Sequence, residues 1–407
     1  MNSSTSSSDS PDQRRVFARI FLTVLIGMGL SLALVKGVLA MLGVGSSSLL
    51  ERVTQARDAL PQIVEEPQDL VIAFGSSMID AGFSPREFDM AINQAGGNIK
   101  SFNFGFGGLN PMFQDYLARR IRDDFEANDR RLKLVVIEFN PFQTTKSRRN
   151  LQAALEESYI SLLANPPELR DITLDDPESG IRMALIRYLR DGISAEMITT
   201  FLWGGPFQTP RDDTGVDFEP DEAAEERIGE IVKVLTPRLE EDYPDYDGTD
   251  WYYPWQGGGT IKSERSPETV DLINEYYNLA ASDYNLAVDR LDRIQSADIE
   301  ELHFDPELVE AFIRIVENFQ AISDHVEIVM LPKNTDWIKN PPEALDRQAA
   351  VVREIETGTG LVVRDYQTIE PVTNAMFSDT THLNRYQGAV AFTAFLAEQY
   401  AELLVAP

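Results

Sequence analysis

Two short runs of the chain are almost entirely apolar, residues 70–74 (LVIAF) and 132–139 (LKLVVIEF). A strand of this composition has both faces covered, as the strands of parallel sheets do. Shorter runs of similar character occupy residues 98–104, 326–331 and 361–366. Segments with helical patterning separate the runs, at residues 85–95, 111–127, 306–323, 343–356 and 386–403. This alternation predicts an α/β fold built on a doubly wound parallel sheet.

The alternation breaks between residues 145 and 300. This region contains amphipathic segments but no good pair of strand-like runs; the segments are residues 150–164, 179–200, 221–239 and 268–298. We therefore predict a mostly helical insertion within a sheet domain that spans residues 67–407.

The N-terminal region contains an uncharged stretch, residues 20–35, inside an apolar segment from Phe17 to about Leu42. A helix needs roughly 20 apolar residues to cross a bilayer. The segment is preceded by Arg14, Arg15 and Arg19, and the positive-inside rule then keeps the N-terminus in the cytoplasm and exports the body. We predict a disordered cytoplasmic tail, a single transmembrane anchor and a linker, at residues 1–15, 16–44 and 45–66. The alternatives are a signal peptide cleaved near Ala40 and a soluble protein.

The composition excludes several kinds of site. The chain has no cysteine, which removes thiol catalysis, iron–sulfur clusters and Cys-ligated zinc. Its three histidines, His303, His325 and His382, include no i,i+4 pair, so a histidine-built metal site is not expected. The formal net charge of -30 repels a phosphate backbone and argues against nucleic-acid binding. We predict neither a metal nor a cofactor.

Gly75, Ser76 and Ser77 directly follow the strand-like run at residues 70–74. Ligands of open α/β sheets bind outside the carboxyl ends of the strands, so a serine here faces a ligand site. The start of a following helix favours the oxyanion formed when a serine attacks a carbonyl. Gly-Ser pairs also end many strands as ordinary turns. We predict Ser77 as a nucleophile and assign Ser76 a structural role, because successive strand side chains point in opposite directions.

A second polar motif lies near the C-terminus, Asp379-Thr380-Thr381-His382. Residues at i and i+3 share one face of a helical turn, so the carboxylate of Asp379 can fix the tautomer of His382. The other imidazole nitrogen is then free to act as the general base that a serine hydroxyl requires. The plain alternative is that Asp379 caps the following helix and His382 lies on the surface.

Two further segments supply hydrogen-bond donors at strand ends. A glycine-rich turn at residues 105–108 leaves backbone N–H groups accessible, and Asn140 adds an amide side chain after the run at residues 132–139. Backbone N–H groups together with an asparagine are typical of an oxyanion hole. The glycine spacing does not match a dinucleotide-binding fingerprint, because Asn110 stands where the third glycine belongs.

Taken in order, these motifs resemble the four blocks of the SGNH/GDSL hydrolase superfamily, over about residues 70–145 and 325–403. The resemblance implies a flavodoxin-like sheet and a catalytic triad of Ser77, Asp379 and His382. It also implies an oxyanion hole formed by the backbone N–H groups of Ser77 and Gly108 and the amide of Asn140. The chain departs from the family pattern in two places. Ser76 replaces an aspartate, and Glu-Phe-Asn-Pro at residues 138–141 replaces Gly-Gly-Asn-Asp.

The Gly-Ser-Ser block, the single anchor and the large insertion are similar to a membrane-anchored branch of this superfamily. That branch includes the D-alanyl transfer protein of teichoic acid synthesis and the alginate O-acetylation proteins. The resemblance implies a protein on the outer side of the bacterial cytoplasmic membrane. It also implies a membrane-bound O-acyltransferase partner that delivers the acyl group, and an envelope glycan that accepts it.

An aromatic and acidic patch at residues 243–255 includes Trp251, Tyr252 and Trp255. Aromatic faces beside carboxylates suit the binding of a sugar substrate; alternatively, the rings pin a long loop to the domain. The patch does not complete a calcium loop, because Pro254 stands where the EF-hand glutamate belongs.

The sequence thus predicts a membrane-anchored serine O-acyltransferase or carbohydrate esterase that acts on a cell-envelope glycan through an acyl-Ser77 intermediate. The alternative from another class is a non-catalytic envelope protein with the same fold, which binds glycan or scaffolds a polysaccharide-modifying complex.

Overall fold

The computed structural model describes residues 11–41, 48–107, 109–189, 222–242, 266–280, 294–377, 381–384 and 387–405. Its centre is a five-stranded sheet whose neighbouring strands all run parallel. The strands are β1 (Asp69–Ser76), β2 (Ile99–Phe106), β3 (Leu132–Glu138), β4 (Ser323–Met330) and β5 (Val363–Asp365). Their order, β2-β1-β3-β4-β5, is that of flavodoxin-like doubly wound sheets. The predicted α/β fold with a parallel sheet is confirmed, and each strand overlaps an expected run.

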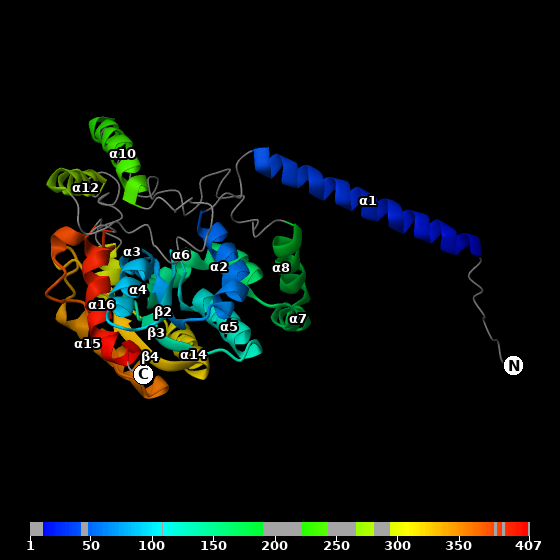
Figure 1. The fold of residues 1–407 in the computed structure, drawn as a ribbon. Coiled ribbons are helices and arrows are strands. Elements are labelled where there is room, and N and C mark those ends of the chain that lie inside the picture. Colours follow the sequence, from blue (N-terminus) through cyan, green and yellow to red (C-terminus); the bar gives the residue numbers. More distant parts are fainter. Residues whose placement is uncertain are drawn as a thin grey trace.

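Helices cover both faces of the sheet, and each face has its own apolar core (Figure 1). One face carries α2 (Ser48–Glu65), α5 (Pro111–Ala127), α14 (Pro306–Ile322) and α15 (Pro342–Thr359). The other carries α3 (Ser77–Gly82), α4 (Pro85–Gln94) and α16 (Gly388–Val405). Along β1, Ile72 and Phe74 join the first core, whereas Val71 and Ala73 join the second. This two-sided burial explains why the strand-forming runs are almost continuously apolar.

Residues 48–65, expected as part of a linker, form α2 and belong to the packed body. The helix packs on the sheet through Val53, Ala56, Leu60 and Ile63. Near its start, Arg52 forms an ion pair with Asp80 of α3 at 2.7 Å. The same side chain donates to the backbone oxygen of Gly105 at 3.0 Å, near the end of β2. The chain therefore enters α2 at the edge of the sheet where the strands end.

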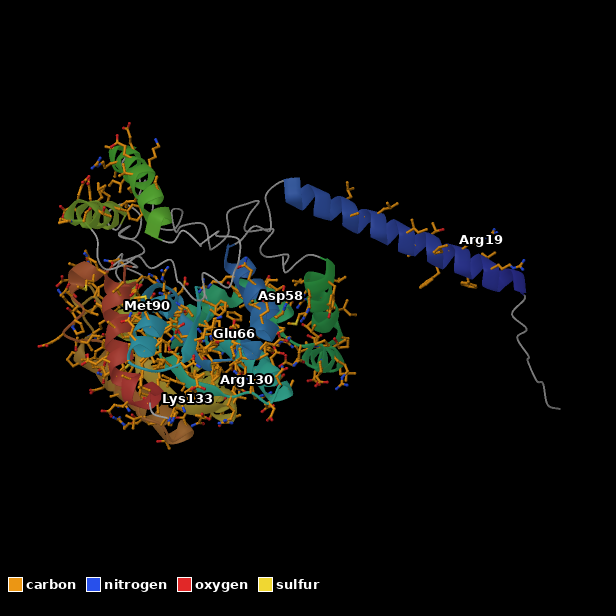
Figure 2. All side chains as sticks on the ribbon, in the orientation of Figure 1. Arg19, Asp58, Glu66, Met90, Arg130 and Lys133 are labelled. Carbon is orange, nitrogen blue, oxygen red and sulfur yellow. The ribbon has the colours of Figure 1, made fainter. Side chains whose placement is uncertain are left out.

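The opposite edge, where the strands begin, is held by Arg130. Its guanidinium donates to the backbone oxygens of Glu66 and Gln68, at 2.7 and 3.2 Å. These bonds join the turn before β3 to the segment that enters β1, and Figure 2 marks Glu66 and Arg130 where the two segments meet.

The region between β3 and β4 is mostly helical in its described residues, as expected for the insertion. It contains the 3-10 helix η1 (Pro141–Thr144), α6 (Lys146–Leu163), α7 (Pro166–Asp175), α8 (Pro177–Leu189), α10 (Glu222–Asp242), α12 (Pro267–Ala280) and the π-helical segment η3 (Ile294–Glu301). α6 and α7 add Tyr159, Leu163 and Leu169 to the first core. α10 buries Ile231 and Leu235 against α12.

The N-terminal helix α1 (Pro11–Met41) extends away from the sheet domain (Figure 1). Residues 11–15, expected in the disordered tail, are part of this helix, and residues 1–10 lie outside the described residues. Many apolar side chains of α1 are exposed, namely Val16, Phe17, Ile20, Phe21, Leu22, Val24, Ile26, Leu30 and Leu34. In the part of the chain that the structure describes, no helix combines the length and the hydropathy needed to cross a membrane.

Candidate active site

The candidate site lies where the sheet topology reverses. β2 follows β1 along the chain and lies on one side of it, whereas β3 lies on the other side. The connections that leave β1 and β3 therefore cover opposite faces of the sheet, so the ends of these two strands form the switch point at which open α/β sheets bind ligands. Ser76 ends β1, Ser77 begins α3, and Asn140 follows the end of β3. Residues from the ends of both strands thus meet at this switch point.

Ser77 and His382 are joined at this point. Nε2 of His382 lies 2.7 Å from Oγ of Ser77, a hydrogen-bonding distance, although 305 positions separate the residues in sequence. Both side chains are half-buried, so they are ordered by the fold and still reached from solvent. A hydroxyl bonded to an imidazole nitrogen is the arrangement in which a serine can be activated as a nucleophile.

The loop that carries His382 is held at both ends. Phe377 and Leu383 form an isolated antiparallel bridge. The side chain of Asn384 accepts from the backbone N–H groups of Gln387 and Gly388 at the start of α16, at 2.7 and 3.1 Å. These contacts fix the chain next to His382 and thereby hold its imidazole over α3.

The other ring nitrogen of His382 faces its own loop. Oγ1 of Thr381 lies 3.2 Å from Nδ1, a contact that the Asp-Thr-Thr-His motif alone does not predict. Asp379, expected to orient this nitrogen, lies outside the described residues.

The side chain of Ser76 points into a buried polar cluster, and the residue is 1% exposed. Its backbone N–H donates to Oε2 of Glu138 at 2.7 Å, and its hydroxyl donates to Oε1 at 3.0 Å. The hydroxyl oxygen also accepts from the N–H of Met78 at 3.2 Å, which caps α3, and from Nδ2 of Asn140 at 3.1 Å. This is the structural turn role expected of Ser76.

Glu138 is the site residue that sequence reasoning misses. It ends β3 with 3% of its surface exposed. Burial raises the pKa of its carboxyl from 4.5 to about 7, while hydrogen bonds from Ser76 and Asn140 and the charge of His382 act in the opposite direction. A buried carboxylate at a strand end is rare enough to be a functional signal, and it could have been noticed in the sequence.

Asn140 is oriented by both ends of its amide. Oδ1 accepts from the N–H of Phe142 at 3.0 Å and so caps η1. Nδ2 donates to Oγ of Ser76 at 3.1 Å and lies 3.4 Å from Sδ of Met78. A thioether is a weak acceptor, so the N–H that faces Met78 is the one that a substrate oxyanion can take over.

The end of β2, which leads into the glycine-rich turn, packs closely against the helix that begins with Ser77. A Cβ on Gly105 would overlap the backbone N of Asp80 in α3, so only glycine fits there. Gly108, expected to supply an oxyanion donor from this turn, lies outside the described residues, as do Trp251, Tyr252 and Trp255.

Among the described residues, no group of three or more histidine, aspartate or glutamate side chains is placed to hold a metal ion. No protein-family model matches the chain, and no curated protein matches its sequence. The functional assignment therefore depends on the geometry of the site itself.

Proposed function

We propose that this protein is a serine O-acyltransferase or esterase in which Ser77 is the nucleophile and His382 is the general base. The observation that carries the proposal is the 2.7 Å contact between Nε2 of His382 and Oγ of Ser77 at the switch point of the sheet. A serine hydroxyl is a weak nucleophile near neutral pH and needs a base at about this distance. Asp379 completes the proposed triad by orienting His382, as the resemblance to the SGNH superfamily implies.

The proposed reaction has two steps. First, Oγ of Ser77 attacks the acyl carbonyl and passes its proton to Nε2 of His382; the bond to the leaving group breaks as that group takes the proton. Second, a glycan hydroxyl or water attacks acyl-Ser77 and gives its proton to His382; the ester bond breaks as Ser77 recovers the proton. The N–H groups of Ser77 and Gly108 and the amide of Asn140 stabilise the oxyanion in both steps.

We also propose that α1 is a single-pass anchor that keeps the site on the outer side of the bacterial cytoplasmic membrane. Its exposed apolar side chains favour leaving water, and the arginines at its start fit the positive-inside rule. Carbonate washing of membranes is expected to leave the full-length protein in the pellet. Its release into the supernatant would contradict an anchor.

The short connection to α2 supports an acyl donor at the membrane. α2 starts at the catalytic edge of the sheet, and residues 42–47 are all that separate it from α1. The seven peptide steps from Met41 to Ser48 reach about 25 Å at most, so the end of α1 is tethered close to that edge. We therefore propose a membrane-bound O-acyltransferase partner as the source of the acyl group and an envelope glycan as its acceptor. Trp251, Tyr252 and Trp255 are the proposed sugar-binding residues.

Incubating the full-length protein in detergent with an activated acetyl ester tests the proposed activity. We expect acetate release that saturates with ester concentration and disappears in Ser77→Ala. A soluble polysaccharide added to the reaction is expected to divert acetyl groups to glycan hydroxyls in a transferase and to leave acetate release unchanged in an esterase. Ser266→Ala, which alters an exposed serine of the insertion, is the matched control and is expected to retain turnover.

A folded wild-type protein without Ser77-dependent acetate release would contradict the catalytic proposal. That result would favour the non-catalytic alternative, in which the same fold binds glycan or scaffolds a synthesis complex.

A further inference from the structure

The hydrogen bonds around Ser76 require an acceptor on both oxygens of Glu138. The hydroxyl oxygen of Ser76 already accepts two hydrogen bonds, from Met78 and Asn140, so its own proton must go to Oε1 of Glu138. The backbone N–H of Ser76 goes to Oε2. Because both carboxyl oxygens accept, the network is complete when Glu138 is ionised. Protonation would remove the negative charge that strengthens both bonds from Ser76, and it would add an O–H that needs an acceptor of its own inside this buried cluster.

The fold reserves space for this carboxylate. A Cβ on Gly75 would overlap Oε2 of Glu138 and lie 2.6 Å from Cβ of Glu138. A glycine at this position is therefore what allows the Glu138 side chain to lie beneath the turn that carries Ser77. Without the carboxylate, the same close approach of β1 and β3 would leave the donors of Ser76 buried and unpaired.

The groups that face Glu138 come from several elements. β1 contributes Gly75 and Ser76, and Asn140 contributes its amide from the start of η1. Ile79 of α3 borders the same space, and Val329 is the register partner of Glu138 on β4. Among the described residues, His382 is the titratable group whose charge acts on Glu138. The same attraction favours the imidazolium that His382 becomes when it accepts the Ser77 proton.

We propose that Glu138 is a positioning residue whose ionised carboxylate holds Ser76, and through Ser76 the Asn140 amide and the first turn of α3, in the reactive arrangement. The site is therefore switched off by acid when Glu138 takes up a proton. This inference rests on the proposed acyl-transfer function. Burial places this acid switch near neutral pH. It raises the pKa of Glu138 to about 7, so the ionised form predominates only above that pH.

The rate at which a fluorophosphonate labels Ser77, followed by mass spectrometry between about pH 5 and pH 9, tests this inference on the full-length protein. Labelling needs both a neutral His382 and an ionised Glu138. In the wild type, the rate is therefore expected to fall more steeply than tenfold per pH unit, towards a hundredfold, over the pH range in which both groups take up protons. A single controlling group would give about tenfold per unit.

Glu138→Gln keeps the shape of the side chain but replaces one acceptor by a donor, so one Ser76 donor loses its partner. At pH 8 the variant is expected to label about 10- to 100-fold more slowly than wild type, because misplacement of a reacting group is costly. On the acid side of its pH–rate profile, the labelling rate is expected to fall with the shallower slope, about tenfold per pH unit, that His382 alone produces.

Asp89→Asn is the matched control. Asp89 is another carboxyl whose pKa burial raises to about 7, and it accepts from the backbone N–H of Ser101 near the start of β2, at 2.9 and 3.2 Å. Asp89 is on α4, beside the start of β2 and therefore away from the edge where the strands end. Asp89→Asn is expected to keep the wild-type labelling rate and the steeper acid limb.

Each outcome decides between the proposals. Labelling of the wild type with the shallow slope, or an unchanged rate and slope in Glu138→Gln, overturns the role of Glu138 and leaves the acyl-transfer function intact. An equal loss in Asp89→Asn also overturns it, because the effect would then belong to any buried carboxyl. Absence of labelling at Ser77 at every pH overturns the proposed function itself. If Glu138→Gln does not fold, the acid slope of the wild-type labelling rate tests the role of Glu138 by itself.

Discussion

Replacing Ser77 or His382 by alanine is expected to lower the turnover of an acyl ester by about 10⁴- to 10⁶-fold, and replacing both is expected to cost no more than the larger single loss. The hydroxyl and the imidazole lie 2.7 Å apart, and in the proposed mechanism they act on the same proton. Once one is gone, the other has nothing left to contribute. The measurement is kcat/KM for ester hydrolysis by the two single variants and the double variant.

His325→Ala is the control for the histidine change. His325 lies exposed on β4, so its removal is expected to leave turnover within about twofold of wild type. Losses that multiply in the double variant would mean that Ser77 and His382 act independently, and would contradict a nucleophile–base pair.

Replacing Asn140 is expected to lower kcat by about 10²- to 10³-fold with a smaller change in KM, the usual cost of removing one oxyanion-hole donor. Asn140→Asp is the sharper of two variants. It keeps an oxygen to cap η1 through Phe142 but removes the Nδ2 donor that lies beside Ser76 and Met78. Asn140→Ala also loses the cap, so it is expected to be the less stable of the two variants.

Asn93→Ala separates the oxyanion role from general destabilisation. Asn93 is a similarly engaged amide, which donates to and accepts from the backbone of Ile99 at 3.0 and 2.8 Å, at the start of β2. It is expected to lower stability while leaving kcat unchanged. A loss in Asn140→Asp that appears wholly in KM would contradict transition-state stabilisation by this amide.

The sheet could be predicted because the burial of each strand is visible in the residues of that strand alone. Strands buried on both faces need apolar side chains at nearly every position, and Leu70 to Phe74 and Leu132 to Ile137 show this directly. α2 was less visible because its few buried positions are interspersed with charged residues such as Arg52 and Arg57, and Pro61 lies inside it. Its helical character is established by packing against the sheet rather than by its composition.

The site was predictable in part for the same reason. Ends of parallel strands share one edge, so Ser77 and Asn140 could be placed together from the sequence. His382 lies in the loop before α16, and this helix packs on the same face of the sheet as α3, which Ser77 begins. Glu138 ends the same run, so its place at this edge could be predicted too, but its role could not. Its role depends on Gly75, which lies beside it only because Phe74 and Ile137 are paired in the preceding register position.

Glu138 also lowers stability, which sets it apart from core residues. Its pKa is about 7 in the folded protein against 4.5 ordinarily, so between these pH values the folded chain holds a proton that the unfolded chain releases. The free energy of unfolding therefore falls as pH rises from 4.5 to about 7, by about 3 kcal/mol, and stays lower above it. A buried group that costs stability is typical of functional sites.

Intact-mass analysis of the full-length protein after exposure to a fluorophosphonate tests the central claim most directly. If Ser77 is a nucleophile activated by His382, the folded wild type is expected to gain one adduct that maps to Ser77. Ser77→Ala and His382→Ala are expected to gain none on the same time scale. A folded wild type without an adduct, or an adduct that persists in Ser77→Ala, would contradict catalysis by Ser77.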